Sequence, residues 1–360
     1  MILLIITRIV DKNSSNAGFI YNWVKKIGET VDKLIVICQE TGDYSGLPKN
    51  IEINSLGKEK GNSKLIQFIK FQLLVVSRLS SVDGVFSHMM PVYSIVAGPF
   101  CKIFRKKLVQ WYTHKSTDWK LKLANLFVSE FATASPESFR LKTKKKVNIL
   151  GHGIDTSRFA PTNNLQHTTN NFKIITIGRI SPAKDYESII KAVYDLKDSV
   201  RNATDNVAGG DNIKLTIIGG IGLQNQQIYF DQLKAMVKNM KLENQVDFLG
   251  PIANAKIPPY LQESDLFINL SDTGSLDKAV LEAMATGTLV LTSNEAFKEI
   301  LPAELLTQKD NPKILAQNIK ALINLSPEKK QQLEKQLRQE VVNNHNLDNL
   351  AKKIVKLYES

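Results

Sequence analysis

The sequence predicts an α/β protein with two domains, each built on a parallel β-sheet covered by helices. Two observations lead to this prediction. The chain has 360 residues, which is long for one hydrophobic core and sufficient for two. Short apolar runs also alternate with helix-like stretches along both halves of the chain, and alternating units of this kind build parallel sheets.

The first half begins with the apolar run Ile2–Thr7, which we expect to form a buried strand. The run is too short for a secretion signal, and no small-residue cleavage site follows it. Further apolar runs predict strands at Lys33–Cys38, Ile51–Asn54, Gly84–Ser87, Lys107–Tyr112, Phe131–Thr133 and Val147–Leu150. Helical patterns lie between them at Gly18–Gly28, Ser63–Leu79, Tyr93–Phe104 and Asp118–Val128.

The second half repeats this alternation of strand and helix. Its predicted strands are Phe172–Gly178, Lys214–Gly220, Val246–Leu249, Leu266–Leu270 and Leu289–Thr292. Its predicted helices are Asp185–Asp195, Tyr229–Asn239, Lys278–Thr286 and Asn311–Asn324. The chain ends in an amphipathic helix over Leu347–Tyr358.

Polar interruptions suggest where the domains divide. Thr162–Asn171 lacks any hydrophobic period and predicts a linker, whereas Arg201–Asn212 predicts an exposed loop. We therefore place an N-terminal domain at 1–160 and a C-terminal domain at 161–342. Residues 343–360 form a last helix that we expect to pack back toward the first domain. Ligands of parallel sheets bind outside the carboxyl ends of the strands, so we expect a site between the two sheets.

The charge of the chain is unevenly distributed. Residues 1–165 contain 24 Lys and Arg against 12 Asp and Glu, whereas residues 166–360 contain 23 of each kind. The net charge of +12 therefore belongs to the first half, which suggests a phospholipid surface, a lipid phosphate or nucleic acid as partner. No apolar stretch reaches the roughly 20 residues of a membrane span. The two cysteines lack a disulfide or zinc pattern, so we expect a cytoplasmic protein.

A pair of cations follows a predicted strand of the second half. Gly178 and Arg179 end the strand, and Lys184 comes five residues after Arg179, just before a helix. Arginine can form two parallel hydrogen bonds to phosphate oxygens, and a helix N-terminus carries a partial positive charge. The pair therefore suits a diphosphate, whose growing charge as a leaving group it would stabilise. On these residues alone, an exposed arginine and lysine in a loop are an equal alternative.

The stretch Ser271–Gly287 predicts a strand end, a turn containing Gly274 and Ser275, and a helix that carries Glu282. Such a turn can direct backbone N–H groups at a phosphate or a sugar hydroxyl. The Glu282 carboxylate lies about one turn into the helix and suits the hydroxyl donors of a ribose. The alternatives are an ordinary helix glutamate and, for Gly287, a simple C-cap.

Taken together, these motifs resemble glycosyltransferase family 4. The residues that carry the resemblance are Gly178-Arg179 with Lys184, the segment Leu281–Gly287, and Gly151–Asp155 with Arg158-Phe159. Each motif alone is weak, but their order and spacing are specific, and the resemblance covers essentially the whole chain. It implies the GT-B fold, in which two Rossmann-like domains with parallel sheets face each other across a deep cleft. It also implies transfer of a hexosyl unit from a nucleoside-diphosphate sugar to an acceptor hydroxyl, with retention of configuration.

The resemblance implies roles for five residues. Arg179 and Lys184 would bind the donor diphosphate and act in catalysis, and Glu282 would bind the nucleotide ribose. Gly18 matches a glycine loop that approaches the donor phosphates. His114 would lie near the transferred sugar as a catalytic residue. No Asp-x-Asp motif stands where a metal-dependent transferase would need one, so we expect no metal and no cofactor besides the donor substrate.

One position departs from the family pattern. The family has a second glutamate eight residues before Glu282, where this chain has Gly274. Asp277, in the same turn, could replace that glutamate in binding the donor sugar, but we favour a role as N-cap of the following helix. For His88, which ends a predicted strand, we favour a structural role, and we expect His152 to shape the turn that leaves the first domain.

The acceptor would dock on the basic first domain. The predicted helix Ser63–Leu79 carries Lys64, Lys70 and Arg78 among apolar residues, which favours loose attachment to the inner face of an anionic membrane. A lipid-linked or cell-envelope acceptor, in polysaccharide or glycolipid synthesis, would fit this location. A core helix with solvated lysines is a nearly equal alternative.

Three other functions stay open. A sugar-nucleotide epimerase on the same fold would need no acceptor. An inactive relative that binds a nucleotide sugar without transferring it is suggested by Gly274. A nucleic-acid-binding protein is suggested by the basic pI, although the sequence contains no recognised nucleic-acid module, so we expect no nucleic acid as partner.

Overall fold

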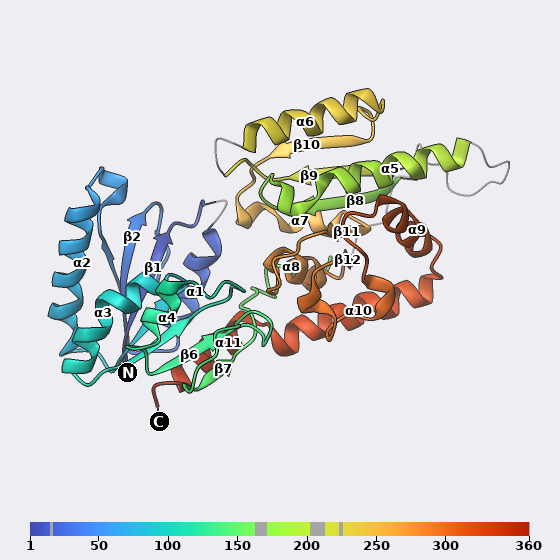
Figure 1. The fold of residues 1–360 in the computed structure, drawn as a ribbon. Coiled ribbons are helices and arrows are strands. Elements are labelled where there is room, and N and C mark those ends of the chain that lie inside the picture. The colour runs from blue at the N-terminus through green and yellow to red at the C-terminus, as the bar shows by residue number, and fades with distance from the viewer. Residues whose placement is uncertain (15–16, 163–170, 202–212, 223–225, 360) are drawn as a thin grey trace. The chain divides into compact units, whose positions relative to one another are not determined.

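The computed structural model describes residues 1–360 except 15–16, 163–170, 202–212, 223–225 and 360 (Figure 1). The predicted linker Thr162–Asn171 and the predicted loop Arg201–Asn212 therefore lie largely outside the described residues. The chain forms two compact units. Unit 1 consists of Met1–Asp155, Ala253–Ala255 and Asn344–Ser360, and unit 2 consists of Thr156–Ile252 and Lys256–Asn343.

Unit 1 is built on a seven-stranded parallel sheet with the strand order β3-β2-β1-β4-β5-β6-β7. The strands are β1 (Ile2–Val10), β2 (Lys33–Thr41), β3 (Ile51–Ser55), β4 (Gly84–His88), β5 (Lys107–Trp111), β6 (Glu130–Thr133) and β7 (Val147–Ile149). β1, β2 and β4 are apolar and buried along most of their length, because helices cover both faces of the sheet.

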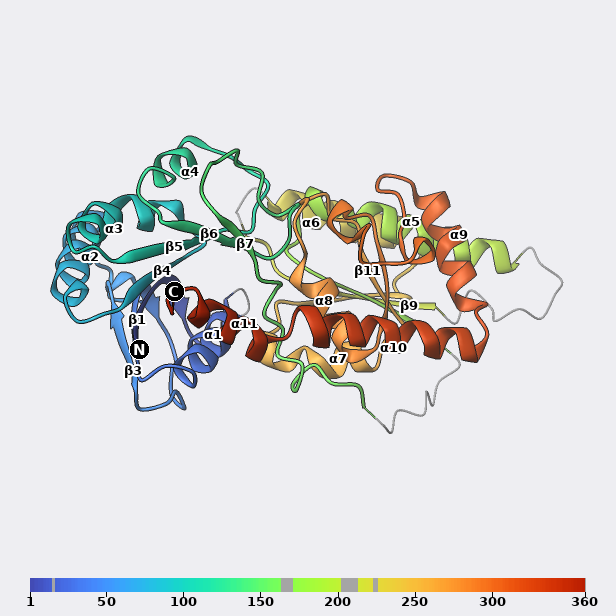
Figure 2. The same ribbon diagram turned by 90° about the horizontal axis from the view of Figure 1, so that it is seen from below.

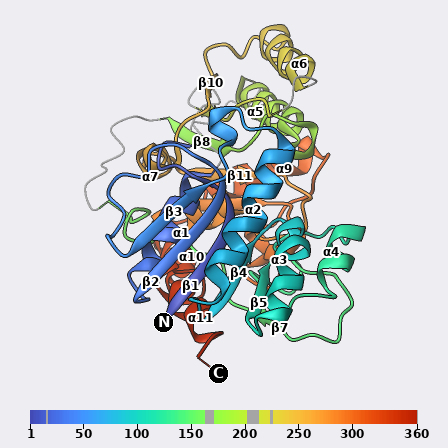
Figure 3. The same cartoon turned by 90° about the vertical axis from the view of Figure 1, so that its left-hand side faces the viewer.

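The helices of unit 1 are α1 (Gly18–Gly28), α2 (Lys64–Leu79), α3 (Pro91–Ile103), α4 (Trp119–Ala124) and α11 (Leu347–Lys356). α2, α3 and α4 pack side by side, and α1 packs against α11 (Figures 1 and 3). Lys26 on α1 forms an ion pair with Asp348 on α11 at 2.8 Å, and the Tyr358 hydroxyl donates a hydrogen bond to the Val85 carbonyl at 2.8 Å. The last helix of the chain is therefore part of unit 1.

Unit 2 contains a five-stranded parallel sheet with the order β10-β9-β8-β11-β12. The strands are β8 (Phe172–Ile177), β9 (Ile213–Ile218), β10 (Val246–Gly250), β11 (Leu266–Asn269) and β12 (Leu289–Thr292). The helices are α5 (Tyr186–Arg201), α6 (Gln226–Asn239), α7 (Pro258–Gln262), α8 (Lys278–Thr286), α9 (Pro312–Ile323) and α10 (Pro327–Asn344). α5 packs against α9, and α7 lies beside α8 (Figure 2).

The predicted α/β class with two Rossmann-like parallel sheets is confirmed. Three helices differ most from the prediction, and one of them, the five-residue α7, was not expected. α10 was not expected, because its only buried side chains in 18 residues are Leu333, Leu337 and Val341, and polar residues hide this four-residue spacing. The helix expected over Asp118–Val128 is shortened to α4, which begins after the N-cap Asp118. Among the described helices, none has the length and apolar character to cross a bilayer.

Candidate functional site

The sheet of unit 2 reverses its strand order beside β8. From β8 the chain continues to β9 and β10 on one side of the sheet, and it returns to place β11 on the other side. All pairs are parallel, so the carboxyl ends of β8 and β11 lie next to each other at one edge. In open α/β sheets, ligands bind outside such a reversal, because the loops after the two strands diverge there.

The loop after β8 is held in place by a buried tyrosine. The Tyr186 hydroxyl donates a hydrogen bond to the Gly178 carbonyl at 3.0 Å, and burial raises the pKa of this hydroxyl above its usual range. Gly219, at the end of β9, packs so closely that a Cβ there would lie 1.7 Å from the Gly178 carbonyl oxygen. The backbone that carries Arg179 is therefore fixed from two sides.

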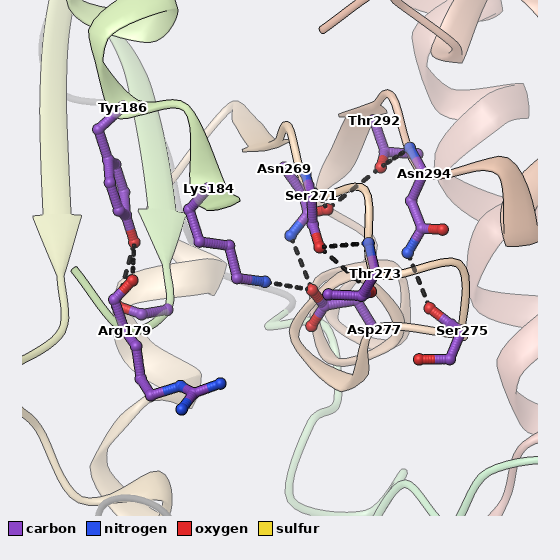
Figure 4. Close-up of polar contacts among 11 residues, drawn as sticks. Arg179, Lys184, Tyr186, Asn269, Ser271, Thr273, Ser275, Asp277, Thr292 and Asn294 are labelled. Carbon is purple, nitrogen blue, oxygen red and sulfur yellow. Dashed lines mark hydrogen bonds and ion pairs between the residues drawn. The ribbon is translucent and has the colours of Figure 1, made fainter. Parts of the chain in front are cut away.

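The two predicted cations differ in their surroundings (Figure 4). Arg179 is exposed, and its guanidinium group forms no hydrogen bond or ion pair with any described residue. Lys184 is largely buried, with 17% of its side chain exposed, and its Nζ forms an ion pair with Asp277 Oδ2 at 2.5 Å. Asp277 also accepts a hydrogen bond from Asn269 Nδ2 at 3.0 Å. This contact joins the loop after β8 to the loop after β11.

The Asp277 carboxylate is ionised in this setting. Burial alone would raise its pKa, but the Lys184 charge and the hydrogen bonds from Lys184 and Asn269 lower it below the usual value. Asp277 occupies the N-cap position of α8, yet its side chain makes no capping hydrogen bond. The carboxylate is directed mainly at Lys184, although the Ala279 backbone N–H also helps to lower its pKa, so the expected capping role is only a minor part of what Asp277 does.

The turn between β11 and α8 is ordered by two asparagines (Figure 4). Asn269 Oδ1 accepts hydrogen bonds from the Ser271 backbone N–H and the Thr292 hydroxyl, both at 3.3 Å. Asn294 Nδ2 donates to the Ser275 carbonyl at 2.8 Å. The turn that was predicted to face a phosphate is therefore held from two places: from Asn269 at the end of β11 and from Asn294 in the loop after β12.

Gly274 lies within this turn, and Glu282 lies in the helix that follows it. Gly274 has φ +60°, a conformation that glycine adopts without the steric cost other residues pay. Glu282 lies in α8 and is 6% exposed, and Gly287 ends the helix as a left-handed C-cap. The predicted site residues therefore follow the two neighbouring strands at the reversal. Arg179 and Lys184 come after β8, whereas Gly274, Ser275 and Asp277 come after β11, and Glu282 lies further on in α8.

One detail of the predicted site changes. The N-terminus of α5, which was expected to add positive charge beside Lys184, is capped by the buried Asp185. Asp185 Oδ1 accepts a hydrogen bond from the Ser188 backbone N–H at 3.3 Å, and Oδ2 accepts from that of Asp310 at 2.9 Å. The positive charge on this side of the site therefore comes from side chains rather than from the helix end.

The sheet of unit 1 has the same kind of reversal, between β1 and β4. There the Thr7 hydroxyl and His88 Nδ1 form a hydrogen bond at 3.1 Å, and both side chains are buried. The Trp23 ring lies 5.3 Å from the His88 ring and 5.1 Å from the Trp111 ring, measured between ring centroids. His88 therefore belongs to a buried aromatic cluster, which fits the structural role that we favoured.

The two remaining predicted residues belong to unit 1. Gly18 is buried at the start of α1, and its N–H donates to the Ser14 carbonyl at 3.0 Å. His114 is exposed in the loop after β5, where its Nδ1 accepts a hydrogen bond from the Ser116 N–H at 3.0 Å. The roles expected for both residues stay predictions.

Sequence reasoning missed Asn269 and Tyr186. Asn269 ends a strand that is otherwise apolar and buried, and a polar residue at that position is a signal that could have been used. Tyr186 begins an amphipathic helix, and nothing in its local pattern separates it from a core tyrosine. No group of three or more His, Cys, Asp and Glu side chains gathers as a metal site in the described part of the chain.

Comparison with known proteins identifies relatives. The chain is 28% identical over 160 residues to mannosylfructose-phosphate synthase of Agrobacterium fabrum, covering 42% of this chain and 33% of that protein. It is 23% identical over 181 residues to alpha-monoglucosyldiacylglycerol synthase of Streptococcus pneumoniae, covering 47% of this chain and 37% of that protein. The matches thus span about a third of these curated relatives.

A solved structure shares the fold. The crystal structure of Anabaena Alr3699/HepE in complex with UDP superposes over 100% of both chains with a TM-score of 0.77, at 17% sequence identity. The family model for glycosyl transferases group 1 matches residues 160–340, which is half of the chain and covers every residue of the site at the reversal in unit 2. The chain belongs to the glycosyl transferases group 1 family.

Proposed function

We propose that this chain transfers a hexosyl unit from a nucleoside-diphosphate sugar to an acceptor hydroxyl, with retention of configuration. The observation that carries the proposal is the position of Arg179 and Lys184 at the strand reversal of unit 2, opposite the turn that leads into α8. The HepE structure that shares this fold is a complex with UDP, which supports a nucleotide donor.

Arg179 and Lys184 would bind the diphosphate in different ways. The Arg179 guanidinium has no described partner and can form two hydrogen bonds to phosphate oxygens. Lys184 is held by Asp277, so its Nζ would stay at a fixed place beside the leaving phosphate. Charge that is already in position stabilises the developing diphosphate without reorganisation. The buried Glu282 would accept hydrogen bonds from ribose hydroxyls.

Retention would follow from attack on the face that the diphosphate leaves. The bond from the anomeric carbon to the phosphate oxygen breaks, the acceptor oxygen bonds to the same carbon, and the acceptor proton passes to the departing phosphate. Asp277 is engaged by Lys184 and Asn269, so it is poorly placed to act as a covalent nucleophile. A product of inverted configuration, observed by NMR, would overturn this part of the proposal.

We further propose a lipid-linked or cell-envelope acceptor that is used at the inner face of a membrane. All of the net positive charge lies in residues 1–165, which suits an anionic surface or a lipid phosphate. The pneumococcal relative is named for the synthesis of a glycosyldiacylglycerol, which is a lipid product.

A thermal-shift panel of UDP-, GDP- and ADP-sugars tests donor binding. A ligand at a hundred times its Kd stabilises the folded state by about 2.7 kcal/mol, which raises Tm by several degrees. We expect one nucleotide to produce such a shift in the wild type and a much smaller one in Arg179→Ala. No shift with any donor would contradict the proposal, and epimerisation of a donor without acceptor would identify an epimerase instead.

A second candidate is a relative that binds nucleotide sugars without transferring them. Two features favour it: Gly274 stands where the family has a glutamate, and Asp277 neutralises Lys184. This candidate predicts a thermal shift with a donor but no glycosylated product with any lipid-phosphate or sugar acceptor.

A further inference from the structure

The outer side of α2 carries an exposed apolar stripe. Leu65, Ile69, Leu73 and Val76 are spaced by four, four and three residues, which places them along one side of a helix. All four are exposed, Leu65 to 67% and Leu73 to 66%, and Ile66 is exposed beside them. We call these five residues the α2 stripe. No charged residue interrupts it.

Packing within unit 1 does not account for the stripe. The buried residues of α2 are Phe71, Val75 and Leu79, which face the sheet from the opposite side of the helix. A surface helix normally carries charged or polar residues on the side turned away from the core. α2 is instead apolar on both sides, and contiguous exposed apolar surface of this kind marks an interaction site.

The surroundings of the stripe are basic. Residues 60–117 contain nine Lys and Arg and one acidic residue, Asp83, which accepts a hydrogen bond from the Ile2 N–H at 2.7 Å. Arg78 and Lys107 are ion-paired with Glu52 and Glu130. Lys64 and Lys70, on α2 itself, form no ion pair with the residues that the structure describes. The charge next to the stripe is therefore uncompensated and positive.

Neighbouring helices extend the same character. α3 and α4 lie on the same face of the sheet as α2 (Figures 1 and 3). α3 ends in the exposed Ile103, preceded by Lys102, and α4 begins with the exposed Trp119, followed by Lys120. Tryptophan and lysine are the residues that anchor proteins at the boundary between headgroups and acyl chains.

We propose that α2 docks on an anionic phospholipid surface, with the α2 stripe among the acyl chains and Lys64 and Lys70 at the headgroups. The charge decides between possible occupants. A second copy of this chain seated on the stripe would bring two basic surfaces together, whereas an anionic membrane complements both the apolar and the basic residues. This inference rests on the proposed function, because docking on a membrane would bring the enzyme to a lipid-linked acceptor.

The test uses the full chain with phosphatidylcholine vesicles that either contain or lack phosphatidylglycerol. We expect flotation with the anionic vesicles, at least about tenfold weaker binding to the neutral ones, and loss of binding at high salt. The variant Ile69→Gln/Leu73→Gln should bind anionic vesicles at least about tenfold more weakly, because two inserted side chains become polar. Both positions are exposed, so the fold should persist.

Two controls make the result specific. Ile228→Gln removes an exposed isoleucine (69%) from α6 in unit 2 and should leave vesicle binding unchanged. The nucleotide-induced thermal shift should be the same in the stripe variant as in the wild type. Vesicle binding without any nucleotide shift would remove the proposed function and leave the docking surface in place.

Three results would overturn the docking proposal. One is equal binding of the wild type and the stripe variant to anionic vesicles, and another is the absence of vesicle binding by a folded wild type that responds to a nucleotide. The third is a wild-type dimer in sedimentation that the stripe variant converts to a monomer, without vesicle binding by either protein. That result would assign the stripe to a contact between copies of this chain.

Discussion

The two sheets reverse their strand order in the same way, but the side chains that bridge the two reversals differ in kind. In unit 1, Thr7 and His88 form a hydrogen bond beside a cluster of buried aromatic rings. In unit 2, Lys184 and Asp277 form an ion pair next to the exposed Arg179, whose guanidinium forms no hydrogen bond or ion pair with a described residue. Charged side chains make a strand reversal suited to a polar ligand, whereas the reversal of unit 1 is lined by buried aromatic rings. The two reversals therefore share a topology but differ in charge, and we propose only the one in unit 2 as the diphosphate site.

The largest expected effect is at Arg179. Because the Arg179 guanidinium forms no hydrogen bond or ion pair with a described residue, Arg179→Ala should leave Tm nearly unchanged. By contrast, kcat/KM for the donor should fall by about 10²–10³ through loss of charge stabilisation at the leaving phosphate. Steady-state kinetics with the donor found in the thermal-shift panel measures this. Lys191→Ala, which removes an exposed cation of α5 on the same unit, is the matched control. Equal losses of kcat/KM in both variants would mean that the overall positive charge of unit 2, rather than the position of Arg179, assists the reaction.

The next effect is on stability. Asp277→Ala leaves Lys184 largely buried without a partner, and breaking such a pair costs about 3 kcal/mol in the free energy of unfolding. Urea unfolding of the wild type and of Asp277→Ala measures the difference in the free energy of unfolding. The nucleotide-induced thermal shift of each protein reports whether unit 2 is still folded. A loss below about 1 kcal/mol would show that water replaces the carboxylate at little cost. The ion pair of unit 2 would then differ less from the Thr7–His88 hydrogen bond of unit 1.

The same pair predicts a dependence on pH. Since the folded-state pKa of Asp277 is lowered, the stability that its ionisation contributes is complete above the unfolded value of about 3.9 and is lost as the pH falls through the folded-state pKa. The stability difference between wild type and Asp277→Asn should therefore be constant from about pH 7 to pH 5 and shrink below about pH 4. A difference that grows on acidification would mean that Asp277 is protonated in the folded protein.

The sequence predicts those parts of the site that depend on local order. The cations after β8, the turn with Gly274 and the helix with Glu282 were all found from spacing along the chain. The partner of Lys184 was not found, because Asp277 lies 93 residues away and meets it only when β8 and β11 become neighbours. Tyr186 and Asn269 act through the same tertiary placement. α10 was missed for a different reason, since three buried residues in 18 give too weak a period.

A smaller effect is expected at the turn itself. Gly274→Ala places a side chain at φ +60°, which costs about 1–2 kcal/mol, whereas Gly274→Asn should cost less because asparagine tolerates this conformation. Thermal unfolding of the two variants measures the difference. If alanine and asparagine are equally tolerated, the turn relaxes to another conformation, and a glutamate at this position would be sterically possible as well.

The smallest effect concerns the reversal in unit 1. Thr7→Val and His88→Leu each remove one partner of the hydrogen bond, and the double variant removes both, so a double-mutant cycle isolates their coupling. We expect a coupling of about 0.5–1.5 kcal/mol in the free energy of unfolding, as for a typical intramolecular hydrogen bond. The nucleotide-induced thermal shift should stay the same in all three variants, because neither side chain would touch the donor.

The cycle can contradict this assignment in two separate ways. A coupling near zero would mean that the two groups do not depend on each other, and the reversal in unit 1 would then be closed by the aromatic rings around Trp23 alone. A nucleotide shift that disappears in His88→Leu while Thr7→Val keeps it would make His88 a donor contact. In that case the reversal in unit 1 would be a ligand site like the one proposed in unit 2, and we would assign it to the sugar of the donor rather than to the phosphate.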